Sequence, residues 1–312
     1  MSDPRYDREI WGKIKSFYKS DWDVQRQKNQ KEAYWCRPEG NNQELFQDPR
    51  QRVFARFMRS YLNTTWHKIS LTEEQKNELF SGENIVETSV EKIKSFIVLK
   101  EKSEKKESKG LRNLLKFCEE VSLFIAELSF EKCDFNREQT KIFELFQDAV
   151  RKKFNEKEKK LPISRYEKII YDKLPEPYQT IMRMQKIFPG FGIALACDFL
   201  KESHLCNIAK PDVHISHVFS LMDGIPYSMD LALVKRVSEF AAEVCPADPN
   251  NFCNTGAYNV DKIIWMICSD YDTDADKKKK MRKEDFLQKL AEFRETDKCP
   301  ARPHRPLPVE LT

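Results

Sequence analysis

Apolar residues recur at three- and four-residue spacing along most of the chain, the pattern of helices with one buried face. The strongest stretch runs from 111 to 130, with apolar positions at Leu114, Leu115, Phe117, Cys118, Val121, Phe124, Ile125 and Leu128. Similar stretches cover 5–30, 53–61, 143–154, 181–187, 193–200, 213–222, 231–244 and 261–268. No strand-like alternation of comparable length occurs. The pattern therefore predicts an all-α fold.

Local signals predict where these helices begin and end. Thr72 and Gln75 have the spacing of a capping box, so a helix is expected to start near Glu73. The charged stretch 99–110 predicts a mobile loop or a frayed helix end. Residues 156–161, followed by Pro162, suggest a hinge. We therefore expect an N-terminal helical region at 1–160, a second helical region at 161–298 and an extended, proline-rich tail at 299–312.

Composition narrows the class of protein without naming a function. The chain has 312 residues and a formal net charge of +4, too small a charge to diagnose nucleic-acid binding. Its 9 cysteines contain no C-x-x-C pair, so they are expected to be small buried apolar residues. It has no long apolar run and no basic-then-apolar leader. We expect a cytoplasmic protein, a monomer with no membrane partner.

One turn joins two apolar helices in a form suited to binding phosphate. The segment Phe188-Pro189-Gly190-Phe191-Gly192 lies between the predicted helices 181–187 and 193–200. Glycine accepts positive φ angles and leaves room for another backbone to approach. The turn amides and the N-terminus of the next helix could then bind a phosphate. An ordinary turn between two packed helices has the same sequence features, and both interpretations stay open.

A single carboxylate follows this hairpin. Asp212, in the segment Pro211-Asp212-Val213-His214, precedes the predicted helix 213–222. An aspartate at this position is most often an N-cap. A fixed carboxylate can also stabilise the positive charge that develops on a sugar as its glycosidic bond breaks, or activate a water molecule. His214 and His217 share a helix face, but no third ligand has suitable spacing, so no metal site is expected.

Together, the Pro-Gly-x-Gly hairpin and the Asp-x-His that follows it resemble the helix-hairpin-helix (HhH-GPD) DNA glycosylase superfamily. The resemblance covers residues 176–220. It implies a two-lobed helical fold with the active site in a cleft between the lobes, and a catalytic role for Asp212. It also implies that Gly190, Gly192, Ile193, Ala194 and His214 contact DNA. A monovalent cation at the hairpin is the one cofactor that it implies.

The chain departs from the bifunctional members of that superfamily at one position. Those members carry a lysine two residues after the second hairpin glycine, where this chain has Ala194. Without an amine to form a Schiff base, water is the expected nucleophile. The resemblance therefore implies a monofunctional enzyme. Lys210 is the only amine near Asp212 in the sequence, and we do not expect it to substitute.

The target base must leave the helical stack to be reached, and aromatic side chains could hold it. Tyr34 and Trp35, on a polar loop, are candidates for the base pocket or for a wedge in the duplex. The run Lys277–Lys280 with Arg282 and Lys283 is typical of solvated surface, although it could also contact phosphates. The remaining N-terminal half does not resemble familiar repair enzymes, which suggests an unusual substrate.

That divergence leaves three functions open. A glycosylase could act on a bulky modified base of the kind found in phage genomes, for example in defence against phage. A transferase could modify a flipped base and leave its glycosidic bond intact, as in the alpha-glutamyl/putrescinyl thymine pyrophosphorylase-like group. A non-catalytic module could simply bind DNA through the hairpin, with Asp212 serving only as a helix cap.

Overall fold

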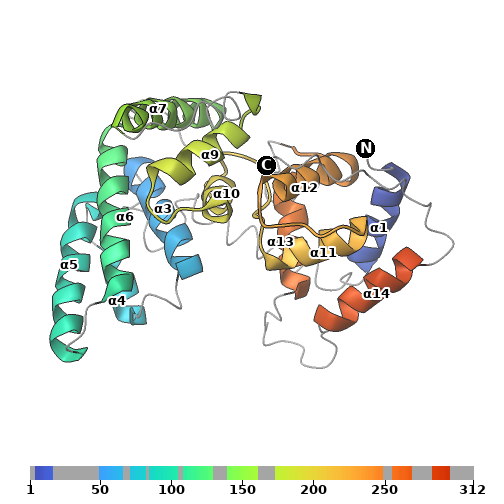
Figure 1. Cartoon of the computed structure of the whole chain (residues 1–312), viewed down its shortest axis with the longest axis horizontal. Coiled ribbons are helices and arrows are strands. Elements are labelled where there is room, and N and C mark those ends of the chain that lie inside the picture. The colour runs from blue at the N-terminus through green and yellow to red at the C-terminus, as the bar shows by residue number, and fades with distance from the viewer. Residues whose placement is uncertain are drawn as a thin grey trace. The chain divides into compact units, whose positions relative to one another are not determined.

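Every regular element in the described part of the chain is an α-helix, which confirms the all-α expectation (Figure 1). The structure is a computed structural model, and it describes residues 4–16, 49–65, 71–81, 84–104, 108–128, 139–160, 173–248, 255–268 and 283–295. The helices form two compact units. The terminal unit comprises residues 1–31 and 207–312, and the central unit comprises residues 32–206.

The central unit is built around a cluster of phenylalanine rings. Its helices are α3 (Pro49–Thr65), α4 (Glu73–Leu79), α5 (Ile85–Glu104), α6 (Lys109–Ala126), α7 (Gln139–Lys160), α9 (Tyr178–Ile187) and α10 (Ile193–Glu202). Phe57 of α3 lies at the centre of the cluster and stacks on Phe199 of α10, with their ring centroids 3.9 Å apart. The other rings around Phe57 are Phe117, Phe124, Phe146, Phe188 and Phe191. Burial of these rings stabilises this unit.

The terminal unit joins the first helix to the last four described helices. Its helices are α1 (Pro4–Ser16), α11 (Val213–Asp223), α12 (Leu231–Val244), α13 (Gly256–Cys268) and α14 (Lys283–Glu295). Apolar side chains from all of these helices share one core. Trp11 of α1 packs edge-on against Phe240 of α12, with their ring centroids 5.9 Å apart. The N-terminal helix is therefore part of this core.

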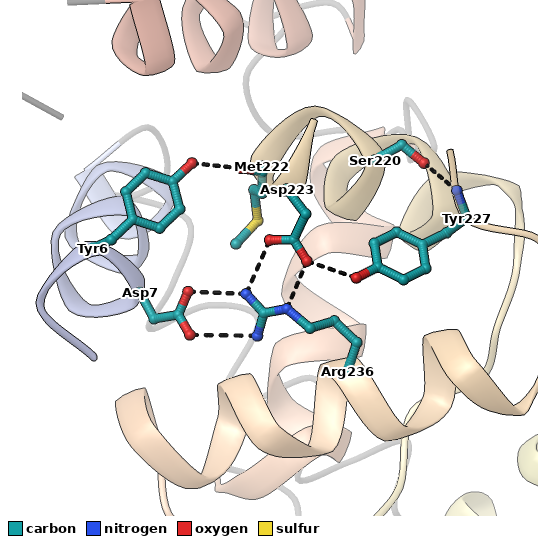
Figure 2. Close-up of polar contacts among 7 residues, drawn as sticks. All are labelled: Tyr6, Asp7, Ser220, Met222, Asp223, Tyr227 and Arg236. Atoms are coloured by element: carbon teal, nitrogen blue, oxygen red, sulfur yellow. Dashed lines mark hydrogen bonds and ion pairs between the residues drawn. The ribbon is translucent and has the colours of Figure 1, made fainter. Parts of the chain in front are cut away.

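A buried ion-pair network fixes α1 in the terminal unit (Figure 2). The guanidinium of Arg236 on α12 donates hydrogen bonds to Asp7 on α1 and to Asp223 at the end of α11. The Tyr227 hydroxyl donates to the Asp223 carboxylate at 2.7 Å, and Tyr6 donates to the Met222 carbonyl at 2.6 Å. The two carboxylates raise the pKa of Arg236 despite its burial, which keeps the guanidinium charged.

Several predicted boundaries are confirmed at the level of single hydrogen bonds. The Gln75 amide donates to the Thr72 hydroxyl at 3.2 Å, and the Thr72 amide donates to the Gln75 side chain at 3.0 Å, so the capping box is present. Helix α12 covers 231–244 as expected. Gly224 ends α11 in the left-handed region, with φ at 69°.

Two charged stretches that were expected to interrupt helices are largely helical. A mobile loop or a frayed helix end was expected over 99–110. Helix α5 continues to Glu104 and α6 begins at Lys109, so a loop is wrong for most of that stretch, although the stretch does contain the end of α5. Lysine and glutamate are good helix formers, and they keep the helix going when no breaker intervenes. The Glu101 carboxylate also accepts bonds from Arg112 at 3.1 Å and from the Ser108 amide at 3.1 Å, which ties the end of α5 to α6.

The second stretch is 156–161, where a hinge between two regions of the chain was expected. Residues 156–160 belong to α7, which packs against α9. The expected boundary between residues 160 and 161 therefore lies inside the central unit, and the chain divides at residues 206 and 207 instead. The expected tail at 299–312 lies outside the described residues.

Candidate functional site

The two phenylalanines of the hairpin anchor it to the core of the central unit. Phe188 and Phe191 are both buried, and each joins the phenylalanine cluster, Phe188 with its ring centroid 4.9 Å from that of Phe57. The Phe191 amide donates to the Phe188 carbonyl at 3.2 Å, which closes the turn. Lys157 of α7 donates to the Ile187 carbonyl at 2.7 Å, so the last residue of α9 is also fixed. A rigid core thus positions an exposed Pro189-Gly190 tip.

The backbone conformation of Gly190 favours glycine. Its φ angle is +72°, a region that residues with a side chain rarely adopt. A Cβ atom there would lie 3.4 Å from the Tyr61 hydroxyl oxygen, an ordinary van der Waals contact, so the backbone angle and not the available space is the constraint. Tyr61 is itself fixed by stacking on Phe117, with ring centroids 4.1 Å apart. Burial raises the pKa of Tyr61, so the hydroxyl beneath the hairpin stays protonated.

The hairpin leaves a row of amides open to a ligand. Gly192 is the N-cap of α10, and its carbonyl accepts bonds from Leu195 and Ala196, both at 3.0 Å. Within the described residues, the amides of Gly190, Gly192, Ile193 and Ala194 have no acceptor. A Cβ on Gly192 would meet nothing within 4 Å, so the space beside it is open. Open amides at a helix N-terminus attract anions such as phosphate.

One side of the hairpin is unsuited to phosphate. A pocket of about 520 Å³ lies against Pro189 and is lined by Lys116, Glu119, Glu120 and the exposed Leu123, with Val90 and Ser122. Two carboxylates against one lysine make this pocket acidic, and it would repel a phosphate. We therefore expect an anion to approach the hairpin on its Gly192 side.

Asp212 is positioned by a segment that is tied to α13. The Asn207 side chain donates to the Thr255 carbonyl at 3.0 Å and accepts from the Tyr258 amide at 3.0 Å. The Lys210 amide donates to the Asp261 carboxylate at 3.1 Å. These bonds fix residues 207–210 before the chain turns into α11. The hairpin belongs to the central unit and Asp212 to the terminal unit.

Asp212 caps α11 with only one of its two carboxylate oxygens. Its Oδ1 atom accepts hydrogen bonds from the His214 amide at 2.9 Å and the Ile215 amide at 3.0 Å. No described residue donates a hydrogen bond to Oδ2. The expected N-cap is therefore present, and the second oxygen remains available to a water molecule or a substrate. Capping and catalysis do not exclude each other here.

His214 lies in a mixed electrostatic environment beside Asp212. Burial lowers its pKa, the Asp212 carboxylate opposes that shift, and the charges of Lys283 and His217 add to it. The Nδ1 atom of His214 is buried and has no hydrogen-bond partner in the part of the chain that the structure describes. Burying a bare nitrogen costs less than burying an unpaired N–H, so the neutral tautomer with its proton on Nε2 is favoured.

From the sequence, Lys283 was expected only to be part of a basic run at the surface. The structure brings its charge close enough to His214 to influence that residue's ionisation. Lys210, the amine considered earlier, uses its backbone amide to bind Asp261. Lys210 is two residues from Asp212 in the sequence, whereas Lys283 is far from it. Spacing along the chain therefore could not predict an effect of Lys283 on this site.

Other expected residues fall outside what the structure describes. Tyr34 and Trp35, the candidates for a base pocket or wedge, are among them, as are Lys277–Lys280 and Arg282. Among the described cysteines, Cys118, Cys197, Cys206, Cys245 and Cys268 carry free thiols. Burial raises the pKa of Cys118 and Cys206 to about 12, so neither is a reactive thiolate. No group of three metal-binding side chains occurs within the described ranges.

Comparisons with protein-family models, curated proteins and solved structures found no match for this chain. None of the described helices is both long and apolar enough to cross a lipid bilayer.

Proposed function

We propose that the protein is a monofunctional DNA glycosylase that hydrolyses the N-glycosidic bond of a flipped, modified base. The observation that carries the proposal is the half-buried carboxylate of Asp212, which is fixed through Oδ1 while Oδ2 has no donor among the described residues. The open amides of the hairpin support DNA as the partner, because they suit the phosphate backbone.

The reaction would use Asp212 in two ways. As the bond between C1′ of the sugar and the base nitrogen breaks, positive charge develops on the sugar, and the carboxylate stabilises it. Water then forms the new bond to C1′, and Asp212 accepts its proton or orients it. The departing base takes up a proton, so the products are a free base and an abasic site. Neutral His214 would act as a hydrogen-bond donor to the DNA and not as the proton acceptor.

Ala194 supports hydrolysis over strand cleavage. Its side chain has no amine, so the position used by bifunctional relatives offers no nucleophile for a Schiff base. The proposed enzyme works in the cytoplasm as a monomer, with a monovalent cation at the hairpin as its one cofactor. A bulky phage-type base is the proposed substrate, bound by aromatic side chains such as Tyr34 and Trp35.

A capping aspartate alone does not indicate catalysis, and the terminal unit contains a matched example. Asp230 caps α12 in the same way: its Oδ1 accepts from the Ala232 amide at 2.9 Å and from the Leu233 amide at 3.3 Å. Asp230 has no place in the proposed reaction. It is therefore the natural control for any substitution of Asp212.

The decisive experiment incubates the wild type, Asp212→Asn and Asp230→Asn with DNAs that carry damaged bases and with hypermodified phage genomes. Mass spectrometry then detects free base, abasic sites and any change in base mass. Asparagine caps helices as well as aspartate does, so both variants are expected to fold. We expect Asp212→Asn to reduce base release by about a hundredfold or more, and Asp230→Asn to leave it unchanged.

The other outcomes separate the two alternative functions. An altered base mass with the glycosidic bond intact would identify a transferase. No product on any DNA, together with salt-sensitive binding that both variants retain, would indicate a non-catalytic DNA-binding module. Equal base release by the wild type and by Asp212→Asn would remove Asp212 from the mechanism.

A further inference from the structure

Helix α13 packs against α11, the helix that Asp212 caps (Figure 1). Asp261 lies on α13, and it is only 1% exposed. Its Oδ2 atom accepts a hydrogen bond of 3.1 Å from the Lys210 backbone amide. A bond from an amide to an ionised carboxylate is stronger than one to a neutral acceptor. A buried carboxylate of α13 therefore holds the backbone two residues before Asp212.

The link between this anchored amide and Asp212 is short and stiff. Pro211 has a fixed φ angle because of its ring, and the residue before a proline is confined largely to extended conformations. Pro211 is itself buried, as are Ile208 and Ala209. Few backbone angles are left free between the Lys210 amide and Asp212. The position of the amide therefore restricts where the Asp212 carboxylate can lie.

Asn207 is a second anchor of the same segment to α13. Its side chain donates to the Thr255 carbonyl at 3.0 Å and accepts from the Tyr258 amide at 3.0 Å. Gly256 makes room for this contact, because a Cβ atom there would lie 2.2 Å from the Asn207 Oδ1 atom. The segment before Asp212 is thus tied to the first half of α13 at two places.

We infer that Asp261, with Asn207 as the second anchor, is a positioning residue for Asp212: it holds the Asp212 carboxylate so that one oxygen caps α11 and the other faces the substrate. This inference rests on the proposed function, because it takes Asp212 as the group that acts on the sugar. Asp261 is buried and acts only through the Lys210 amide. Positioning matters because a displacement of about 1 Å can cost about a hundredfold in rate.

The test measures the Asp212 cap directly, in the full chain and without DNA. The amides of His214 and Ile215 donate to Asp212, so their hydrogen exchange, followed by NMR, reports how often that cap opens. Exchange is compared among the wild type, Asp261→Ala, Asp261→Asn and Asn207→Ala. Asn207→Ala also carries the test on its own if Asp261→Ala does not fold.

Two controls separate positioning from a general loss of stability. Asn259→Ala removes another buried polar side chain from α13, one that is 4% exposed and donates to the Cys245 sulfur at 3.4 Å. The second control lies within each variant: the amides of Ala232 and Leu233, which Asp230 caps in the same unit, report any general loosening.

We expect Asp261→Ala and Asn207→Ala each to speed exchange at His214 and Ile215 about tenfold, as for one lost hydrogen bond, with no change at the cap of Asp230. Asp261→Asn keeps an oxygen that can accept from the Lys210 amide, so it should restore most of the protection. Asn259→Ala should leave the cap of Asp212 unchanged. Wild-type exchange at the Asp212 cap in Asp261→Ala, or equal losses at both caps, would overturn the inference.

The base-release assay then tests the consequence for the reaction. Asp261→Ala should reduce base release about tenfold, in kcat and not in KM, because the groups that bind DNA are intact. Asp261→Asn should recover most of the activity, and Asn259→Ala should match the wild type. Full base release by Asp261→Ala despite a loosened cap would leave the glycosylase standing and overturn the inference.

Failure of the proposed function gives a different result. No base release by the wild type on any DNA would count against the glycosylase. Exchange at His214 and Ile215 would still decide whether Asp261 positions the Asp212 carboxylate, because that measurement needs no substrate.

Discussion

The Arg236 side chain binds the Asp7 carboxylate at 2.9 Å between Nη2 and Oδ1, across 229 residues of sequence. Arg236 is 2% exposed and Asp7 is fully buried, so both charges have left water. Asp223 completes the network with a bond to Arg236 Nε at 2.7 Å. The guanidinium of Arg236 therefore links α1 to α11 and α12 through buried ion pairs, in addition to the apolar packing of α1.

Removal of one member of this pair should destabilise the protein strongly. Asp7→Ala leaves Arg236 with one buried carboxylate in place of two, and breaking a buried ion pair typically costs about 3–5 kcal/mol. We expect that loss in the free energy of unfolding, measured by urea denaturation. Arg8→Ala is the matched control, because Arg8 is the adjacent residue and pairs with Glu243 at the surface. Its effect should stay below about 1 kcal/mol; similar effects of the two variants would contradict this account.

The cap of α11 should be separable from the chemistry of Asp212. Asp212→Ala and Asp230→Ala each remove the acceptor for two helix amides, so each should lower the free energy of unfolding by about 1 kcal/mol. The corresponding asparagine variants should remain close to the wild type. Thermal unfolding measures all four. Under our proposal only the Asp212 variants lose base release, and a parallel loss in the Asp230 variants would mean that activity follows stability.

A charge placed on the hairpin should separate folding from DNA binding. Gly192 has φ at −75° and ψ at 176°, and its Cβ would meet no neighbour, so other residues fit there. Gly192→Asp adds a good N-cap with a favourable charge, and it should keep or raise the melting temperature. The same carboxylate occupies the open amides and repels phosphate, so binding to a DNA duplex with an abasic-site analogue should fall about tenfold or more. Gly192→Asn adds a neutral cap and isolates the charge; equal losses in both variants would rule out an electrostatic cause.

The ionisation of His214 makes a prediction about pH. Burial holds its pKa below the ordinary value of 6.5, so the folded protein binds fewer protons than the unfolded chain as the pH falls through that range. Stability is therefore full above 6.5, decreases on acidification and levels off once the pH is below the folded pKa. His214→Gln should remove this part of the pH dependence, which denaturation at a series of pH values would show.

The neighbours of His214 should shift its pKa in opposite directions. NMR titration of the imidazole should show a lower pKa in Asp212→Asn, because the carboxylate that favours protonation is lost. The pKa should rise in Lys283→Gln and in His217→Gln, because each loses a charge that opposes protonation. A pKa that does not respond to Lys283→Gln would place that lysine away from the site.

Most of the helices could be predicted because their signal is local, although α5 (Ile85–Glu104) was not. Periodic apolar residues define 231–244, and the Thr72–Gln75 capping box needs only neighbours along the chain. A loop over the charged residues 99–104 was wrong, because these residues are good helix formers. The hydrogen bond from Arg112 to Glu101 comes from the next helix, so no local pattern indicates it. Helix α14 was missed, since only Phe286 and Leu290 on it are fully buried.

The amino-acid sequence by itself determined the helices, the turn at Gly190 and the cap at Asp212, because each depends on residues within a few positions. Only the tertiary structure placed Tyr61 against Gly190 and Asp7 on Arg236, and brought the charge of Lys283 near enough to His214 to oppose the protonation of His214. The members of each pair are far apart along the chain, and packing of apolar helix faces brings them together. The pattern of an apolar face does not indicate which helix it packs against. The candidate motif is therefore local, whereas the electrostatic environment of its carboxylate is a property of the fold.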